Sequence, residues 1–223
     1  KTTEYVTKMF ELHRDFIEPY WVCLPMAVRN ALGNDMFWYP WETEKKDILV
    51  RPMPNFDYVI NIENQNFSFY KEKMNQEDLY KQFGKWYKES HGGGKTIALI
   101  GVRADESLHR YSGIVNKKFK YNNENWITKN FKDVWSASPI YDWTTKDVWV
   151  ANAKFGYDYN KIYDLYYQAG LTIDQMRVAS PFNDYAVEGL NMYRVIEPQT
   201  WTKLVGRVNG ANFGAIYGGT KAM

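Results

Sequence analysis

Four polar side chains between residues 103 and 110 have the types and the spacing that would suit anion binding. Arg103, Glu106, Ser107 and Arg110 are three or four positions apart, so on a helical path they share one face. The planar fork of an arginine binds phosphate or sulfate oxygens through two hydrogen bonds. The free N–H groups at the start of a helix also favour an anion. The segment therefore predicts a phosphate- or sulfate-binding site formed by Arg103, Ser107 and Arg110.

Glu106 in the same segment has two interpretations. In the first, it is the candidate catalytic residue, which orients the arginines or helps to bind Mg²⁺ together with the phosphates of a substrate. In the second, Arg103 and Glu106 form an ion pair that caps the helix and has no further role. The residues alone leave both interpretations open.

A strand and a helix are expected to position this polar segment. Residues 96–102 are apolar in the centre, which is typical of a strand covered on both faces in a parallel sheet. A helix over residues 105–114 is expected next, and ligands of such α/β units bind at the carboxyl end of the strand. A second strand is expected over residues 135–143, before a helix with a capping box of Thr144 and Asp147.

The three glycines before Lys95 do not form a Walker phosphate-binding loop. That loop needs Gly, four spacer residues and then Gly-Lys-Ser/Thr at the start of a helix. Glu89 stands where the first glycine is required, and a strand is expected after Thr96. A flexible turn is therefore predicted at residues 92–94.

The rest of the chain predicts a second, mainly helical part. Residues 33–66 are rich in aromatic residues, Pro, Asn and Asp, which indicates an irregular insertion. Further helical patterns begin near Thr3 and Asn75 and recur at residues 161–168, 185–194 and 200–208. We expect an α/β domain over residues 1–180 and a helical extension over residues 181–223.

Composition limits the classes of protein to which the chain can belong. It has 223 residues, 45% hydrophobic and 17% aromatic, enough for one sizeable core with or without a subdomain. The net charge is +2, but residues 81–120 hold nine Lys or Arg against three Asp or Glu, a local balance of 9 − 3 = +6. A solvated charged face is the commoner meaning of such a run, while a phosphate-rich ligand or a nucleic acid is the alternative.

Cysteine and histidine usage predicts no resident metal. The single cysteine, Cys23, cannot form an internal disulfide, and there is no Cys/His set for zinc or for an iron–sulfur cluster. A reducing cytoplasm is the expected setting. No apolar run approaches 18 residues, so no membrane partner is expected. The chain opens in a helical pattern without Met, which suggests a piece of a longer protein.

Two motifs resemble one known family, the phosphoadenosine phosphosulfate reductases. This family lies within the PP-loop ATP pyrophosphatases and adenine nucleotide alpha hydrolases. Its arginine segment, G-x-R-x-x-E/Q-S-x-x-R, matches GVRADESLHR at residues 101–110. Its segment P-I-x-D-W-x-x-x-D-V-W matches residues 139–149, in the same order and at a similar separation. The resemblance covers about residues 1–200 and implies an α/β, Rossmann-like fold with a parallel sheet.

The resemblance also implies a substrate and further site residues. ATP or phosphoadenosine phosphosulfate would be the substrate, with Mg²⁺ as an optional ion. Arg177, in MRVASPF, stands where related reductases keep a substrate-facing loop, and Ser180 beside it would donate to a phosphate. Arg29, in WVCLPMAVRNA, is expected at the same sheet edge as Arg103, with a surface salt bridge as the alternative. These two stretches are most similar to the branch found beside ParB-like partners and on mobile elements.

Two family segments are absent from these residues. The Ser-Gly-Gly-Lys-Asp-Ser-type PP-loop is not found, and we expect it before Lys1, so that the fold here lacks its PP-loop strand. The Glu-Cys-Gly-x-x-His-type segment that attacks the sulfonate is also not found, and Cys23 lies in a hydrophobic strand where thiols are usually inert. Reduction of a sulfonucleotide is therefore not expected, nor is an iron–sulfur cluster.

Three hypotheses for function remain open. The first is an enzyme of reductase or transferase type that binds an adenine nucleotide or sulfonucleotide and cleaves it at the α-phosphate, or performs sulfur-related chemistry. The second is a non-catalytic module that acts with a ParB-like DNA-binding partner. The third is sulfur insertion into DNA, which would need an external sulfur donor.

Overall fold

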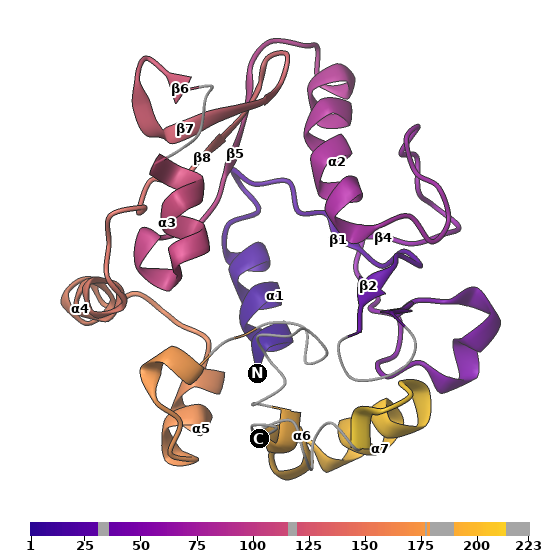
Figure 1. Ribbon diagram of the computed structural model, residues 1–223. Coiled ribbons are helices and arrows are strands. Elements are labelled where there is room, and N and C mark those ends of the chain that lie inside the picture. The colour runs from indigo at the N-terminus through magenta and orange to yellow at the C-terminus, as the bar shows by residue number, and fades with distance from the viewer. Residues whose placement is uncertain (31–35, 116–119, 177, 179–189, 213–223) are drawn as a thin grey trace. The chain divides into compact units, whose positions relative to one another are not determined.

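The computed structural model describes residues 1–30, 36–115, 120–176, 178 and 190–212 (Figure 1). These residues fall into two compact units, and the chain passes between the units more than once. The first unit comprises Lys1–Asn66, Lys71–Gln76 and Asn160–Met223, and the second comprises Phe67–Tyr70 and Glu77–Tyr159. The domain boundary expected at residue 180 lies outside the described residues.

The second unit is built on a four-stranded sheet. Its strands are β5 (Thr96–Leu99), β6 (Lys120–Tyr121), β7 (Glu124–Phe131) and β8 (Val134–Ala137), in the order β5-β8-β7-β6. β5 and β8 are parallel, whereas β7 is antiparallel to both β8 and β6. The expectation of an α/β fold with parallel strands is thus confirmed for the pair β5 and β8, within a mixed sheet.

β5 is shorter and more exposed than the apolar run of residues 96–102 predicted. Ile97 and Leu99 are 53% and 75% exposed, so the expectation that this strand is covered on both faces is wrong for the described chain. The physical reason is that no described element packs over these two side chains, which point to the same face of the sheet; within the sheet, β8 is the only described neighbour of β5. Thr96 N–H donates to Asp133 O at 2.8 Å, and because backbone groups alternate along a strand, those of Ile97 and Leu99 point to the opposite edge.

Helix α2 (Gln76–Ser90) packs closely on the sheet of this unit (Figure 1). A Cβ added at Gly84 would lie 3.1 Å from Val134 Cγ1, so a side chain at this position would crowd the sheet. Phe67 contacts Trp86 of the same helix edge-to-face, with ring centroids 4.7 Å apart. Gly92, Gly93 and Gly94 follow with φ of 82°, 82° and 87°, which confirms the predicted turn before β5.

The helix expected over residues 105–114 is interrupted. A short 3-10 turn, η2 (Ala104–Glu106), is followed by Ser107 in an extended conformation (φ −174°, ψ 158°), and only then does α3 (Leu108–Val115) begin. Ser107 Oγ accepts a hydrogen bond from Arg110 N–H at 3.2 Å, the bond by which a serine starts a helix. The expectation that the polar segment lies on one helix face is therefore wrong.

Helix α4 (Thr145–Phe155) begins as predicted. Thr144 is its N-cap, and the Thr144 hydroxyl accepts a hydrogen bond from Asp147 N–H at 3.2 Å. The Asp147 carboxylate accepts in return from Thr144 N–H at 2.8 Å. This reciprocal capping box is the one predicted from the sequence, and Gly156 ends the helix in the left-handed conformation (φ 66°).

The first unit combines short strand pairs with several helices. β1 (Trp21–Val22) is parallel to β4 (Val59–Ile60), and β2 (Val28–Arg29) is antiparallel to β3 (Phe37–Trp38). The helical elements of this unit are α1 (Thr2–Leu12), the 3-10 helix η1 (Thr43–Ile48), α5 (Ile162–Gln168), the 3-10 helix η3 (Ile173–Gln175), α6 (Leu190–Ile196) and α7 (Pro198–Arg207). The helical patterns of the C-terminal part are thus confirmed where the residues are described.

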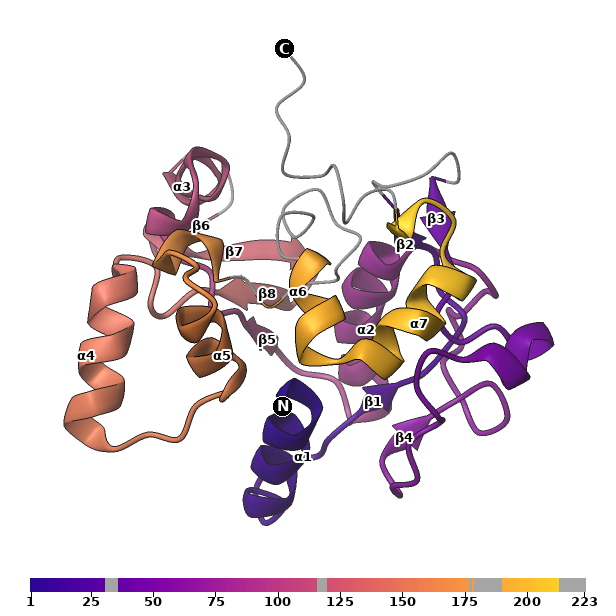
Figure 2. The same ribbon diagram turned by 90° about the horizontal axis from the view of Figure 1, so that it is seen from below.

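The C-terminal helices share a core with the aromatic segment of the first unit. Leu190 of α6 and Leu204 of α7 are 0% and 3% exposed and form a cluster with Val208. Trp38 and Val50 pack against the same cluster, and α7 lies beside β2 and β3 in Figure 2. Trp38 and Val50, which lie in the segment expected to be an irregular insertion, therefore pack on the core of these helices.

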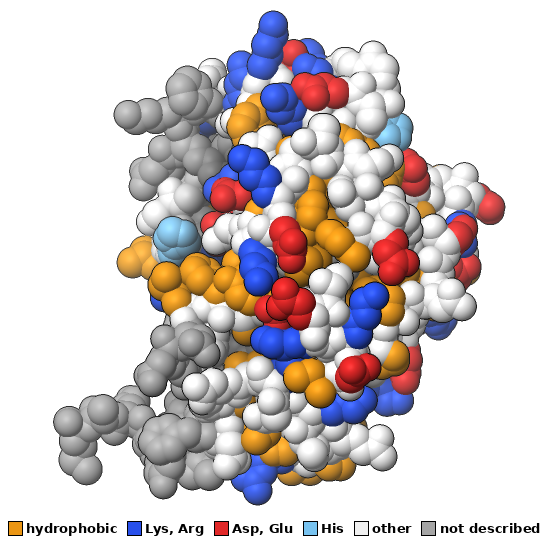
Figure 3. Space-filling view, turned by 90° about the vertical axis from the view of Figure 1, so that its right-hand side faces the viewer, with side chains coloured by type: hydrophobic (Ala, Val, Ile, Leu, Met, Phe, Trp, Pro, Cys, Tyr) orange, Lys and Arg blue, Asp and Glu red, His pale blue; other side chains and the backbone are white. Residues whose placement is uncertain are grey.

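Charged side chains of both signs are interspersed on the surface. Lys and Arg alternate with Asp and Glu over most of the face drawn in Figure 3, with exposed hydrophobic side chains between them. This face therefore does not present a continuous basic surface. In the part of the chain that is described, no helix is both long and apolar enough to cross a bilayer.

Candidate functional site

The Arg103 side chain is held within the second unit by three acceptors. Its Nη1 donates to Thr145 Oγ1 at 3.1 Å, and its Nε lies 3.5 Å from Glu106 Oε1. Nη1 also lies 3.8 Å from Asp105 Oδ2. Because the side chain is only 15% exposed, these three partners hold it inside the protein. Arg103 therefore fixes the loop after β5.

Glu106 lies between two guanidinium groups. Oε1 faces Arg103 and also accepts from Arg103 N–H at 3.3 Å, while Oε2 lies 3.9 Å from Arg110 Nε. The Arg110 side chain is 52% exposed, so its guanidinium still has donors that face solvent. The carboxylate thus orients one buried and one accessible arginine.

Asp105 joins this loop to the first turn of α4. Its Oδ2 accepts hydrogen bonds from Thr145 N–H at 3.0 Å and from Thr145 Oγ1 at 3.3 Å. A backbone hydrogen bond from Ala104 N–H to Tyr141 O, 2.8 Å long, runs alongside. The two sequence motifs, about 40 positions apart, are therefore joined directly at the carboxyl ends of the parallel strands.

The charges of this cluster determine what it can bind. Arg103 and Arg110 are balanced by Asp105 and Glu106, so the cluster itself is neutral. Its binding capacity lies in Arg110, which can offer two donors to an oxyanion. Among the described residues, no group of three or more His, Cys, Asp or Glu is arranged to hold a metal ion.

Arg29 belongs to a different sheet from the one that positions this cluster. It lies on β2, in a two-stranded sheet with β3 in the first unit, and not in the sheet of β5. The expectation that it shares a sheet edge with Arg103 is therefore wrong, since the short strand before it pairs with β4 instead. Arg177 and Ser180, the other predicted ligand-binding residues, lie outside the described residues.

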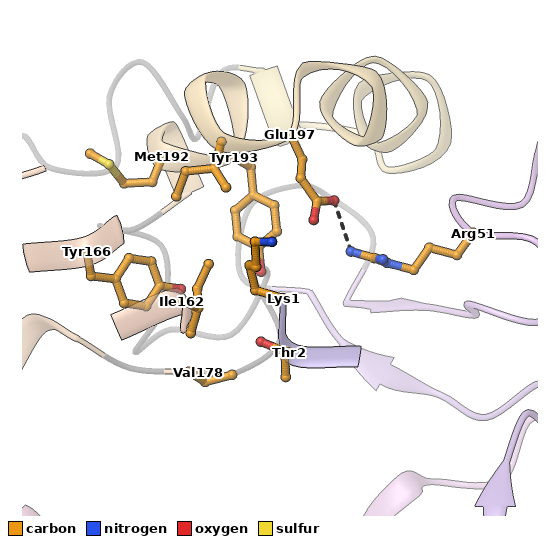
Figure 4. Close-up of a pocket in the computed structure, with 10 residues that line it drawn as sticks. Lys1, Thr2, Arg51, Ile162, Tyr166, Val178, Met192, Tyr193 and Glu197 are labelled. Carbon is orange, nitrogen blue, oxygen red and sulfur yellow. Dashed lines mark hydrogen bonds and ion pairs between the residues drawn. The ribbon is translucent and has the colours of Figure 1, made fainter. Parts of the chain in front are cut away.

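A cavity of about 170 Å³ lies in the first unit (Figure 4). Tyr166 and Tyr193 line it, and burial raises the pKa of Tyr166 to about 12 and also raises that of Tyr193. At its edge, Arg51 Nη2 donates to Glu197 Oε2 at 3.0 Å, the ion pair drawn in Figure 4. Among the described residues that line this cavity, none is predicted to bind a nucleotide.

Sequence reasoning missed the roles of Thr145 and Asp105. The TTKD stretch signals a helix cap through Thr144 and Asp147, but nothing in it shows that the next threonine accepts from an arginine 42 positions earlier. The alternation of Arg and Asp in GVRADES gives only a weak signal for such a network. The roles of both residues can be recognised only from the structure, in which β5 and β8 lie side by side.

Comparison with known proteins places these elements in a family. Residues 43–170 match the family described as the phosphoadenosine phosphosulfate reductase domain, and residues 170–223 match a domain of unknown function, DUF3440. The chain is 33% identical to the "Uncharacterized protein YbdN" of Escherichia coli (strain K12) over 228 residues. That alignment covers 98% of the chain and 53% of YbdN, so the chain spans about half the length of this relative. No solved structure matches the chain.

Proposed function

The chain belongs to the phosphoadenosine phosphosulfate reductase domain family, and we propose that it binds an adenine nucleotide or a sulfonucleotide at the carboxyl end of β5. The observation that carries this proposal is the Arg103–Glu106–Arg110 cluster at the end of one of two parallel strands. In α/β sheets this edge is where ligands bind. The family match includes every residue of the cluster.

Within this site, the residues have separate roles. Arg110 contacts a phosphate or sulfate oxygen, because its guanidinium is half exposed. Glu106 and Arg103 hold Arg110 and the loop in place, and Ser107 starts the helix whose N–H groups face the anion. Glu106 keeps a second role, as a ligand for Mg²⁺ bound to the substrate phosphates.

The PP-loop of the family is proposed to lie on a segment of the protein outside these 223 residues. Two observations support this. The β5 edge opposite β8 has no strand beside it among the described residues, and Ile97 and Leu99 are largely exposed there. An apolar strand with an open edge tends to pair with another strand. In the full-length protein, we therefore expect the amides of Ile97 and Leu99 to be protected from hydrogen exchange.

The reaction proposed is cleavage at the α-phosphate. With ATP, a water molecule or an acceptor hydroxyl forms a bond to the α-phosphorus and gives up its proton to solvent, the bond to the bridging oxygen breaks, and pyrophosphate leaves with the electron pair. With phosphoadenosine phosphosulfate, the same cleavage releases sulfate instead. Cationic groups such as Arg110 and Mg²⁺ stabilise the negative charge that develops on the leaving group. Cys23 takes no part, because burial raises the pKa of its thiol to about 12.

The experiment is to incubate the full-length protein with ATP or phosphoadenosine phosphosulfate and Mg²⁺ and to follow the phosphorus resonances. With ATP, appearance of pyrophosphate together with AMP or a nucleotidyl adduct supports cleavage at the α-phosphate. With phosphoadenosine phosphosulfate, the expected product is adenosine 3′,5′-bisphosphate or its adduct, with release of sulfate. Binding without turnover would favour the second hypothesis, a regulatory module that acts with a ParB-like DNA-binding partner. Absence of both binding and turnover would contradict the proposal.

A further inference from the structure

A second cavity in the first unit is lined by charged residues that are not part of the proposed nucleotide site. It has a volume of about 380 Å³, within the range of sites for small molecules. Three consecutive aromatic residues, Phe37, Trp38 and Tyr39, line one part of it, and Lys45 and Arg207 line another. Arg207 ends α7 and lies within the segment that matches DUF3440.

One carboxylate in this region faces three cations. Glu42 Oε2 accepts from Lys45 Nζ at 2.8 Å and from Arg207 Nη2 at 2.8 Å. Lys73 Nζ lies 4.0 Å from Glu42 Oε1. Three positive charges around one negative charge leave a local balance of 3 − 1 = +2. Because the single carboxylate of Glu42 does not neutralise these three cations, the excess positive charge would attract a second anion to the cavity.

Arg207 has one buried hydrogen-bond donor, Nε, for which the described residues supply no acceptor. Its side chain is only 3% exposed, and Nη2 donates to Tyr39 O at 2.7 Å and to Glu42. Its Nε is buried and has no hydrogen-bond partner among the described residues. An unsatisfied donor on a buried charge is costly, and such atoms mark places where a water molecule or an ion binds. Arg207 also lines the cavity, so a ligand oxygen that reaches Nε from there would satisfy this donor.

The aromatic side of the cavity defines the rest of the ligand. Phe37 and Trp38 belong to β3, whose position is fixed by pairing with β2, and Trp38 also packs against the core of α6 and α7. Lys73 Nζ lies 5.4 Å from the centre of the Tyr39 ring. Phe37 and Trp38 point to opposite faces of β3, so the aromatic side chains contribute separate apolar contacts to the lining, which favour an apolar body on the ligand.

We propose that this cavity binds a small organic oxyanion, in which a carboxylate or phosphate lies against Lys45 and Arg207 and an apolar body contacts Phe37, Trp38 and Tyr39. Every residue that lines this cavity belongs to the first unit, and none of them is assigned to the proposed nucleotide site.

The proposal is tested on the full-length protein with four probes. Benzoate and phenyl phosphate carry both features, inorganic phosphate lacks the ring, and benzamide lacks the charge. Benzoate or phenyl phosphate should bind about tenfold more tightly than benzamide or inorganic phosphate, and the tighter of the two identifies the source of the oxyanion. In an NMR spectrum of the protein labelled with ¹⁵N-arginine, the bound probe should also shift the Nε resonance of Arg207. That resonance is identified as the one that is missing from the spectrum of the Arg207→Lys variant.

Two exposed lysines provide a matched pair of variants. Lys45→Ala should weaken binding of the better probe about tenfold, the loss of one charge-assisted hydrogen bond. Lys46→Ala removes a lysine of similar exposure that does not line this cavity, and it should leave binding unchanged. The proposal is overturned if benzamide binds as well as benzoate, or if Lys45→Ala and Lys46→Ala bind the better probe equally. It is also overturned if the Arg207 Nε resonance stays unshifted when the probe is added, because the probe would then not occupy this cavity.

Discussion

Arg103 donates a hydrogen bond from Nη1 to Thr145 Oγ1 over 3.1 Å, and this bond joins the loop after β5 to the first turn of α4. Thr145 is in turn hydrogen-bonded to Asp105 through both its N–H and its hydroxyl group. The threonine hydroxyl therefore accepts from the arginine and donates to the aspartate. A residue at a variable position of the second motif thus helps to hold the arginine of the first motif in place.

Replacing this hydroxyl should loosen the loop. Thr145→Val keeps the volume but leaves Arg103 Nη1 without its acceptor, so we expect a loss of about 1 kcal/mol in the free energy of unfolding. Thr145→Ser keeps the hydroxyl and should restore most of that loss. Urea denaturation of the three proteins measures both changes. Equal stabilities of the valine and wild-type proteins would show that the bond does not contribute.

The capping box of α4 should make stability depend on pH. The hydrogen bonds from Thr144 hold the pKa of the Asp147 carboxyl below its ordinary value of 3.8. A carboxyl with a lowered pKa in the folded state contributes stability that is present above 3.8 and is lost as the pH falls through the lower, folded-state pKa. Asp147→Asn should therefore lower the melting temperature at pH 7 more than at pH 3.

The matched comparison for this prediction is Asp78→Asn. Asp78 lies in the first turn of α2 and is 61% exposed. Its replacement should change the pH dependence of the melting temperature less than the replacement of Asp147. If both variants follow the wild-type curve at every pH, the capping box does not titrate as the structure indicates.

Glu42 should be the most sensitive acidic residue of the first unit. Its side chain is 9% exposed, and although burial raises its pKa, hydrogen bonds from Lys45 and Arg207 outweigh this effect and lower it. Glu42→Gln removes the negative partner of the buried guanidinium, which should cost about 3 kcal/mol of unfolding free energy. Glu63→Gln, at an ion pair whose side chains are 65% and 76% exposed, should cost much less. Similar losses in chemical denaturation of both variants would contradict the assignment.

Cys23 should be chemically inert in the folded protein. It is 1% exposed, and burial raises the pKa of its thiol to about 12, so almost no thiolate forms near neutral pH. Iodoacetamide at pH 8 should modify it slowly in the native protein and rapidly in urea. Intact mass measured over time distinguishes the two, and rapid native labelling would show that the thiol is accessible.

Local chemistry in this chain could be predicted from sequence, whereas contacts between distant residues could not. The α4 capping box and the glycine turn depend on neighbours within a few residues, and both were predicted correctly. The break at Ser107 was missed because helical spacing does not reveal an extended residue between two turns. The pairing of Glu42 with Arg207, 165 positions apart, left no pattern in the sequence.

The exposure of β5 shows a second limit. The apolar run from Ile97 to Ile100 correctly indicated a strand, but its burial depends on what lies beside it. Arg29 was misplaced for a related reason, since the partner strand of its segment could not be identified from spacing. Sequence patterns predict that a strand exists more securely than which strand pairs with it.

The measurement that tests the central claim most directly is calorimetric titration of the full-length protein with ATP and with phosphoadenosine phosphosulfate in the presence of Mg²⁺, using Arg110→Ala and Lys85→Ala as variants. Both residues are exposed cations with an acidic partner four positions away, but only Arg110 belongs to the proposed site. The loss of one charge-assisted contact in Arg110→Ala should weaken binding of the preferred nucleotide about tenfold, and Lys85→Ala should bind like the wild type. Equal affinity in all three proteins, or no binding by any of them, would contradict the assignment of the site.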